Sequence, residues 1–357
     1  MPRAGGHLAL HLGGAFAAVV VACAVPALCA SLLGKHWPLL VLAVAAIAPA
    51  AFLIVFVGKV ARWMRAPVPF RIPLTVGQQR ALRSIPHSRA GSPLSAFEVI
   101  LRVLLDVLLF RPLFRATPTA PSLARGLAHG MDRSLWFVAV AFHGSLAIIV
   151  LRHLRMFLEP VPGFVAILER FDIATEMVLP KVHVTSLVLP LALAFLLGRR
   201  LVLMRVRTLS LAADYFPLLL LLAIATTGIV MRHFVRTDVA AVKELSIGLA
   251  NWTLFLPARA DGWLMTHVFL VGILLAYFPL SKLMHMPGAL LSPTLTMANI
   301  SREKRHINAR NPQVQVMHYA DYEATFRVRM IEAGLPVEEG PEASPQASRN
   351  KQDGGAA

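Results

Sequence analysis

Cysteine is nearly absent from this sequence. Only two of the 357 residues are cysteine, Cys23 and Cys29, and both fall inside the first long apolar run. Two thiols are too few to hold an iron–sulfur cluster, and their place within one apolar run argues against a structural disulfide bond. We expect both to serve as small apolar packing residues.

Charged residues are also scarce, at 15% of the chain, whereas apolar residues make up 57% and the mean hydropathy is +0.64. A helix needs about 20 mainly apolar residues to cross a bilayer. The runs do not alternate as barrel strands do, and a helix satisfies its own backbone in lipid. We therefore predict an all-α integral membrane bundle with about six transmembrane helices, at Leu8–Leu33, Trp37–Gly58, Leu135–Leu151, Val182–Gly198, Tyr215–Met231 and Trp263–Leu280.

The first run could be mistaken for a secretory signal, because Arg3 precedes it and alanine-rich sequence follows. Its length of about 26 residues exceeds that of a typical signal core, and a second apolar run follows almost at once. We expect a retained membrane anchor.

Acidic residues are the other scarce class: 19 Asp and Glu stand against 35 Lys and Arg, a formal net charge of +16. Nucleic-acid binding would be one reason for such a charge. However, with the N-terminus placed inside, 26 of the basic residues fall on the inner side of the six runs and nine on the outer side. The positive-inside rule therefore predicts a multi-pass protein of the cell inner membrane with both termini in the cytoplasm, and no nucleic-acid partner.

The apolar runs divide the chain into parts of different character. Within a long basic segment, Pro93–Phe114 has apolar residues at helical spacing and charges on its other face, which predicts a helix lying on the membrane surface. The last residues are rich in Glu, Pro, Ser and Gly and are expected to be disordered. The predicted parts are an N-terminal transmembrane hairpin at 1–58, a basic cytoplasmic segment at 59–134, a four-helix membrane domain at 135–286, a cytoplasmic partner-docking segment at 287–335 and a disordered tail at 336–357.

Four of the 13 histidines are associated with just two of the predicted spans. His143 and His153 belong to the third span, and His267 and His285 to the sixth. Because these spans run in opposite directions, His143 and His285 should lie toward the cytoplasm, and His153 and His267 toward the outer face. Two antiparallel helices with an imidazole at each of two depths can hold two haems, one above the other.

The spacing of these histidines leaves two interpretations open. His143 and His153 are ten residues apart and His267 and His285 are 18 apart, or about 15 Å and about 27 Å of helix rise. Pro279 and Pro287 are plausible sites where the sixth helix departs from ideal geometry. The residues indicate either haem ligation or histidines that merely pack within the bundle.

The charged and polar residues near these four histidines also have two or more possible roles. Arg152, Arg155 and Lys282 lie beside the histidines and could pair with haem propionates, or could be ordinary interfacial anchors. His183 and His233, at the outer ends of the fourth and fifth spans, could support the haems, contact a quinone or pack at the interface.

Several stretches resemble the cytochrome b (gamma) subunit of respiratory nitrate reductase, and resemble still more the DsrM family, the cytochrome b membrane subunit of sulfite-reduction-associated DsrMKJOP complexes. The likeness covers roughly Leu135 to Asn311, and the N-terminal hairpin suits the DsrM-like branch. The stretches are Phe142–Gly144, Arg152–Arg155, Asp214–Pro217, Thr227–Arg232, Tyr277–His285, Ser292–Thr294 and Arg305–His306.

The resemblance implies a nitrate-reductase-gamma-like di-haem core of four helices that holds two haem b groups. His143 and His285 would ligate the inner haem iron, and His153 and His267 the outer one. It also implies a menaquinone site near the outer haem, where Lys181 could contact a quinone carbonyl; as an alternative, Lys181 could be an interfacial lysine. No catalytic side chain is implied.

The resemblance further implies an electron-transfer subunit of a quinol-linked oxidoreductase in dissimilatory sulfur metabolism. Electrons would pass between menaquinol near the outer face and a cytoplasmic, DsrK-like iron–sulfur subunit, among other DsrMKJOP-type partners. The alternatives are a cytochrome b subunit of another, nitrate-reductase-like respiratory complex, a membrane transporter and a non-haem membrane anchor. The inverted repeats of many transporters are not recognisable in the sequence.

Overall fold

The computed structural model describes residues 2–66, 77–80, 84–115, 119–122, 126–129, 133–173, 183–299 and 317–338. The chain divides into two units. The first comprises Met1–Ala66 and Phe70–Ile307, and the second comprises Pro67–Pro69 and Asn308–Ala357. The first unit therefore ends inside the predicted docking segment 287–335, and the predicted tail 336–357 lies almost wholly outside the described residues.

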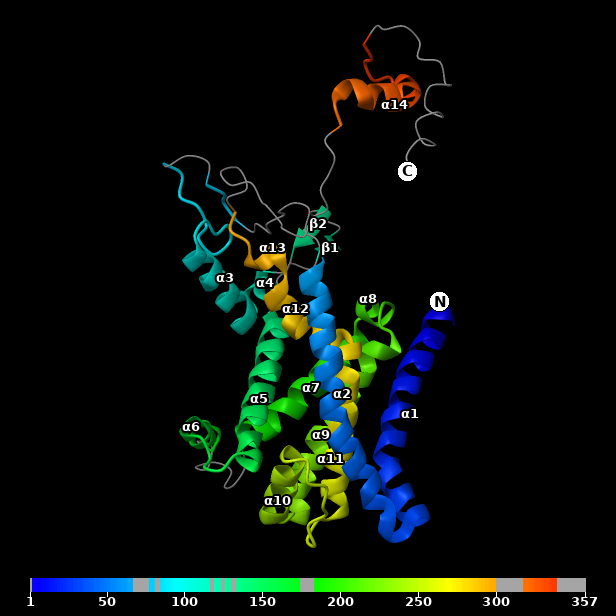
Figure 1. Ribbon diagram of the computed structural model, residues 1–357, viewed down its shortest axis with the longest axis vertical. Coiled ribbons are helices and arrows are strands. Elements are labelled where there is room, and N and C mark those ends of the chain that lie inside the picture. The colour runs from blue at the N-terminus through cyan, green and yellow to red at the C-terminus, as the bar shows by residue number, and fades with distance from the viewer. Residues whose placement is uncertain are drawn as a thin grey trace, which may run out of the picture. The chain divides into compact units, whose positions relative to one another are not determined.

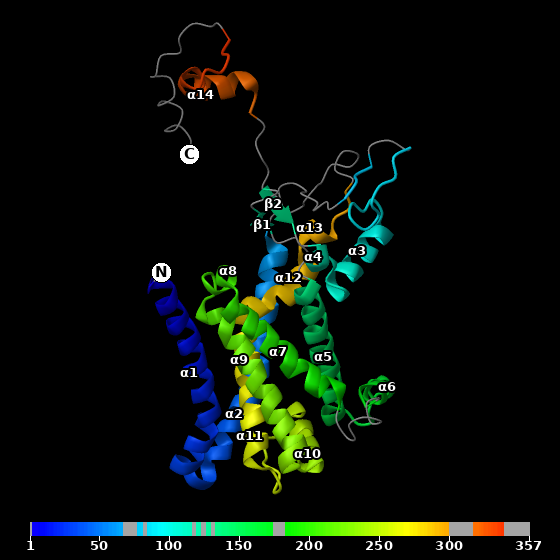
Figure 2. The same cartoon turned by 180° about the vertical axis from the view of Figure 1, so that it is seen from behind.

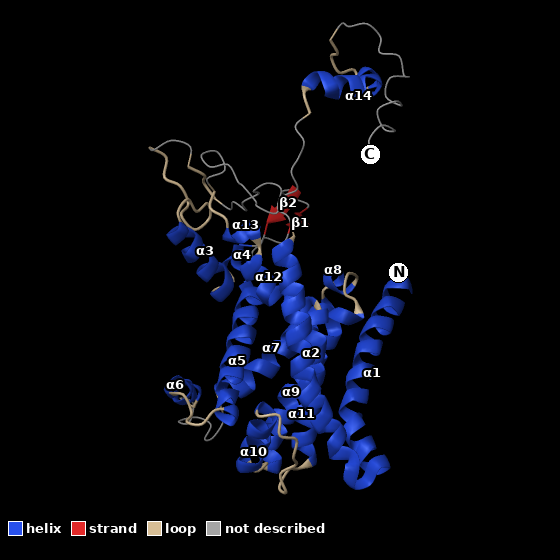
Figure 3. Ribbon diagram, in the orientation of Figure 1, coloured by secondary structure: helices blue, strands red, loops and turns tan. Residues whose placement is uncertain are grey.

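Long helices dominate the first unit (Figure 3). Within the described residues, five continuous helical segments are long and apolar enough to cross a membrane. The first of them, Leu8–Arg65, has 58 residues and folds back on itself, so six long helices form the bundle. They are α1 (Pro2–Leu33), α2 (Trp37–Arg65), α5 (Arg133–Phe157), α7 (Val184–Val202), α9 (Ala212–Ile229) and α11 (Gly262–Tyr277). This confirms the predicted all-α membrane bundle.

A tight turn joins α1 to α2 and makes them an antiparallel hairpin (Figure 1). The short 3-10 turn η1 (Gly34–His36) begins at Gly34, whose φ of +52° suits a residue without a Cβ. Pro38 then lies in the first turn of α2, where its missing N–H has no intrahelical partner to lose.

Basic residues mark one end of the bundle, where two long helices finish. α2 and α7 finish in basic residues, Arg62 and Arg65 in the first case and Arg199 and Arg200 in the second. α5 begins at the same end, and α11 finishes there (Figures 1 and 2). We call this end the basic face, and the end that holds the α1–α2 turn the opposite face.

Short elements occupy the two faces. β1 and β2 pair antiparallel with Thr119 opposite His129. The elements near the basic face are α3 (Ala96–Leu108), α4 (Arg111–Arg115), β1 (Thr119–Ser122), β2 (Gly126–His129), α8 (Met204–Arg207), α12 (His285–Leu291) and α13 (Pro293–Thr296); those near the opposite face are α6 (Gly163–Asp172), the π-helix η2 (Val230–Val235) and α10 (Val239–Ala250).

The predicted surface helix Pro93–Phe114 is not continuous. The hydroxyl of Ser95 accepts a hydrogen bond from the Glu98 N–H and caps α3 at its start. The helix stops after Leu108, because Phe110 has a φ of +48° and α4 starts afresh at Arg111. Spacing alone does not reveal this break, since the apolar pattern runs through it.

The sixth predicted span also departs from α geometry. α11 ends at Tyr277, and two 3-10 turns, η3 (Phe278–Leu280) and η4 (Lys282–Met284), lead to α12. Pro279 lies in the first of these turns, so the helix changes where a proline was expected to disturb it. Lys59 of α2 donates to the Pro279 carbonyl at 3.0 Å and so pairs with a backbone group at this end.

Three clusters of buried side chains connect the long helices. α2 and α11 meet through residues that include Val41, Leu42 and Met265. α5, α7 and α9 meet around Phe142, Leu193 and Leu221, and α1, α9 and α11 meet around Val19, Leu220 and Leu270. Large apolar side chains also cover the outside, which suits a bundle surrounded by lipid chains.

The second unit contains α14 (Tyr319–Glu332). Glu323 forms an ion pair with Arg327 one turn later and accepts a hydrogen bond from the Glu338 N–H at 3.0 Å. Gly334, with a φ of +69°, follows the end of this helix.

Two glycine-to-alanine variants test how closely α2 and α11 pack. A Cβ on Gly272 would lie 2.7 Å from Cγ1 of Val44, whereas a Cβ on Gly58, also in a long helix, would meet nothing within 4 Å. Alanine in a free helical position stabilises by about 1 kcal/mol, and overpacking costs about 1–3 kcal/mol. Gly272→Ala should lower the thermal midpoint in detergent, and Gly58→Ala should not. Adding Val44→Ala to Gly272→Ala should recover part of the loss; a midpoint for Gly272→Ala equal to that of Gly58→Ala would contradict this packing.

Candidate functional site

His143 and His285 lie together near the basic face. His143 belongs to α5 and His285 begins α12, and the centroids of their rings are 6.2 Å apart with the ring planes at 88°. The Nδ1 atom of His143 bonds the Ala139 carbonyl at 2.8 Å, and that of His285 bonds the Lys282 carbonyl at 2.9 Å. A carbonyl only accepts, so Nδ1 carries the hydrogen in both rings. The Nε2 lone pairs are therefore available to a metal.

This arrangement fits two axial ligands of one haem iron. Metal–imidazole bonds are about 2 Å long, and each ring centroid lies about 1 Å beyond its nitrogen, so rings on opposite sides of one iron have centroids about 6 Å apart. The observed 6.2 Å agrees. The described residues contain no group of three or more His, Cys, Asp or Glu side chains suited to a metal ion. Two imidazoles suit an iron that a porphyrin already holds.

Aromatic side chains fix the His143 ring. Phe110 and Phe142 each have ring centroids 4.7 Å from that of His143. Trp136, in the first turn of α5, donates to the Leu109 carbonyl at 2.7 Å and so secures the bend that carries Phe110. The break between α3 and α4 thus places a ring against a candidate ligand.

His153 and His267 show the same tautomer near the opposite face. His153 Nδ1 bonds the Ile149 carbonyl at 2.7 Å, and His267 Nδ1 lies 2.8 Å from the Thr227 hydroxyl oxygen. That hydroxyl donates its own hydrogen to the Ile224 carbonyl at 2.9 Å, so it accepts from His267. All four candidate ligands therefore keep Nε2 for another partner, and His153 and His267 are close enough to interact electrostatically.

Thr227 and Gly228 of α9 position the His267 ring, and neither was predicted from the sequence to have this role. Thr227 supplies the acceptor just described, and Gly228 lets the helix approach, since a Cβ there would lie 3.4 Å from the Cε1 atom of His267. Two sequence signals point to them: they open Thr227–Arg232, one of the stretches that carry the family resemblance, and they belong to a polar pair followed by glycine, Thr226-Thr227-Gly228, inside an apolar run. Neither signal says which of the two threonines faces His267.

The candidate propionate partners are all engaged with carboxylates. Arg152 pairs with Asp172, Arg155 with Glu169, and Lys282 with Asp214 at 2.7 Å. These contacts make each of them part of a structural ion pair, and their contact with propionates stays a prediction. Lys181, the candidate quinone contact, lies outside the described residues.

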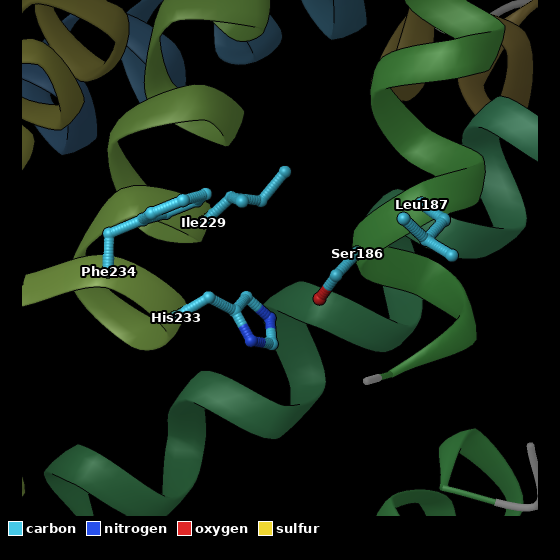
Figure 4. Close-up of a pocket in the computed structure, with 5 residues that line it drawn as sticks. All are labelled: Ser186, Leu187, Ile229, His233 and Phe234. Atoms are coloured by element: carbon cyan, nitrogen blue, oxygen red, sulfur yellow. The ribbon is translucent and has the colours of Figure 1, made fainter. Parts of the chain in front are cut away.

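A pocket of about 280 Å³ lies between the start of α7 and the end of α9 with η2 (Figure 4). The His233 ring and the Ser186 hydroxyl point toward one another across it, and the rest of the wall is apolar. The lining residues are Ser186, Leu187, Ile229, His233 and Phe234.

His183, the residue before α7, is buried beside charged groups. His183 is 1% exposed, and neither ring nitrogen has a hydrogen-bond partner among the residues that the structure describes. Burial first, and then the positive charges of Arg152 and Arg232, lower the pKa of His183 to about 4, against the raising effect of Asp172. The ring is therefore neutral at pH 7.

No protein-family model matches the chain. The chain is 39% identical over 273 residues to the Hdr-like menaquinol oxidoreductase cytochrome b-like subunit of Archaeoglobus fulgidus, a match covering 74% of this chain and 81% of that protein. It is 36% identical over 277 residues to the protein of the same description from Archaeoglobus profundus, covering 75% and 81%. At this identity and coverage, the chain belongs to the family of Hdr-like menaquinol oxidoreductase cytochrome b-like subunits.

Proposed function

We propose that the chain is a di-haem cytochrome b that carries electrons across the membrane between a quinol and an iron–sulfur partner. The observation that carries the proposal is the pairing of His143 with His285, with ring centroids 6.2 Å apart and both Nδ1 atoms bonded to carbonyls. Burial and packing alone do not require this shared tautomer.

His143 and His285 would hold one haem near the basic face, and His153 and His267 a second near the opposite face. Each haem, when bound, supplies a one-electron carrier. The chain's own contribution is orientation: the carbonyls of Ala139, Lys282 and Ile149 and the hydroxyl of Thr227 hold the four rings. Such bonds also make the opposite ring nitrogen a better ligand.

The charge distribution supports an orientation. The basic face, which includes Arg65 and Arg200, would lie in the cytoplasm with both termini of an inner-membrane protein. Quinol, the substrate class in the names of the two relatives, would be oxidised near the opposite face, where its protons leave to the outside. Lys181 remains a candidate contact for that quinone. In an organism that oxidises sulfur compounds, electrons would flow in the opposite direction and reduce the quinone.

The partner must supply the next redox centre. The chain has only Cys23 and Cys29, both in α1, so it cannot hold an iron–sulfur cluster of its own. We propose a cytoplasmic, DsrK-like iron–sulfur subunit that docks on the basic segments and on 287–335, within a DsrM-type complex of dissimilatory sulfur metabolism.

A visible spectrum of the purified protein tests the proposal. Two b-type haems per chain are expected. His143→Ala should remove one of them and His153→Ala the other, because each variant loses a different iron ligand. His36→Ala, in the turn after α1, is the control and should keep both. A colourless wild-type protein, or loss of the same haem in both ligand variants, would overturn the proposed pairing.

Neighbouring threonines offer a matched pair for the second haem. Thr227→Val removes the acceptor of His267, whereas Thr226→Val removes a hydroxyl that only donates to the Leu222 carbonyl. Loss of such a support costs a metal site about 10–100-fold in affinity. Thr227→Val should therefore speed the transfer of the haem proposed at His267 to apomyoglobin, and it should shift the midpoint potential of that haem. Thr226→Val should change neither, and equal effects of the two substitutions would contradict the role of Thr227.

A further inference from the structure

The pocket between α7 and η2 adjoins the support of His267. Thr227 and Gly228 contact that ring, and the next residue, Ile229, lines the pocket. The pocket wall and the His267 support are therefore adjacent residues of one helix end.

The size and chemistry of the pocket suit a flat, mostly apolar ring. Its volume of about 280 Å³ lies just below the range of about 300–1,000 Å³ for small-molecule sites, so it suits a small ring. Ser186 and His233 are its polar groups, and they stand on opposite walls (Figure 4). Leu187 is 43% exposed and Phe234 77%, so the pocket opens toward the lipid-facing surface, where an isoprenoid tail would remain.

The π-helix explains how the second wall forms. In η2 the backbone bonds run from residue i to i+5, so side chains five apart come near the same face. Phe234 therefore joins Ile229 on the pocket side, together with His233. Arg236, with a φ of +56°, ends the π-helix and sets its length. Such insertions cost helix stability and are frequent at functional sites.

A second imidazole lies near the pocket. His183 interacts electrostatically with His233, and also with Arg152, Arg232 and Asp172. Its pKa is lowered to about 4, so it stays neutral beside His233 and does not itself take up a proton at pH 7. Within the described residues its two ring nitrogens have no hydrogen-bond partner, although the side chain is buried.

We propose that this pocket binds the quinol ring of the proposed function, and that His233 is the catalytic residue that takes the proton of a quinol hydroxyl. In the first step the O–H bond that faces His233 breaks, its proton goes to an imidazole nitrogen of His233, and one electron would leave to the haem proposed at His153 and His267. Loss of the proton of the other hydroxyl to solvent, and of a second electron to the same carrier once it has passed on the first, turns the quinol into the quinone. Ser186 would hydrogen-bond the other oxygen of the ring.

The inference rests on the proposed function, and two variants test it apart from that function. His233→Gln keeps a hydrogen-bonding side chain but cannot accept a proton at neutral pH. Menadione should bind the purified haem-loaded variant with a dissociation constant within about threefold of the wild type, while the rate of haem reduction by menadiol falls about 100-fold, as for loss of a general base. Ser186→Leu fills the pocket and should weaken menadione binding at least about tenfold, a change expected when an apolar side chain occupies the ring's space.

The haem spectrum after dithionite reduction serves as the folding control, and His36→Gln is the matched histidine control. If wild-type protein binds menadione and is reduced by menadiol, but both variants behave like it, the pocket assignment is wrong and the proposed function stands. If haem-loaded wild-type protein neither binds menadione nor accepts electrons from menadiol, the proposed function itself fails. Should one variant lose its haems, the other decides the outcome alone.

Discussion

A backbone carbonyl can accept a hydrogen bond but never donate one, and this constraint sets the chemistry of the central histidines. Where Nδ1 of His143, His153 or His285 meets a carbonyl, the hydrogen must sit on that nitrogen. Thr227 enforces the same result at His267, because its own hydrogen is already given to Ile224. In every case the lone pair remains on Nε2. A bundle of otherwise apolar helices thereby presents candidate metal ligands at two depths.

Helix packing turns that local constraint into a paired site. α5 brings two imidazoles to the bundle, and α11 with the turns after it brings the other two. The pairing depends on how closely the neighbouring helices approach, and glycine permits two close contacts between them: Gly228 against His267, and Gly272 against Val44 of α2. The small residues serve packing in lipid, where close van der Waals contact replaces the hydrophobic effect between helices.

Much of this was predictable from the sequence, and the exceptions have physical causes. Hydropathy was enough for the six spans because each must be apolar over its whole length. The opposite directions of the third and sixth predicted spans were enough to place His143 and His285 at the same depth in the membrane. By contrast, spacing could not show that Phe110 interrupts the surface helix, that Thr227 rather than Thr226 faces His267, or that a π-helix ends α9. Those features depend on contacts between elements, which no single run of residues records. The family itself is shown by the sequence identity to the two Archaeoglobus proteins.

The angle between the two imidazole planes gives the most direct test of the account. The rings of His143 and His285 are almost perpendicular, at 88°. A low-spin ferric haem between perpendicular imidazoles gives a strongly anisotropic electron paramagnetic resonance signal, unlike the rhombic signal of parallel rings. Purified, oxidised protein should therefore show that anisotropic signal, and His285→Ala should remove the part of it that belongs to this haem. A high-spin signal alone, a rhombic signal alone, or an anisotropic signal that is undiminished in His285→Ala would contradict the account.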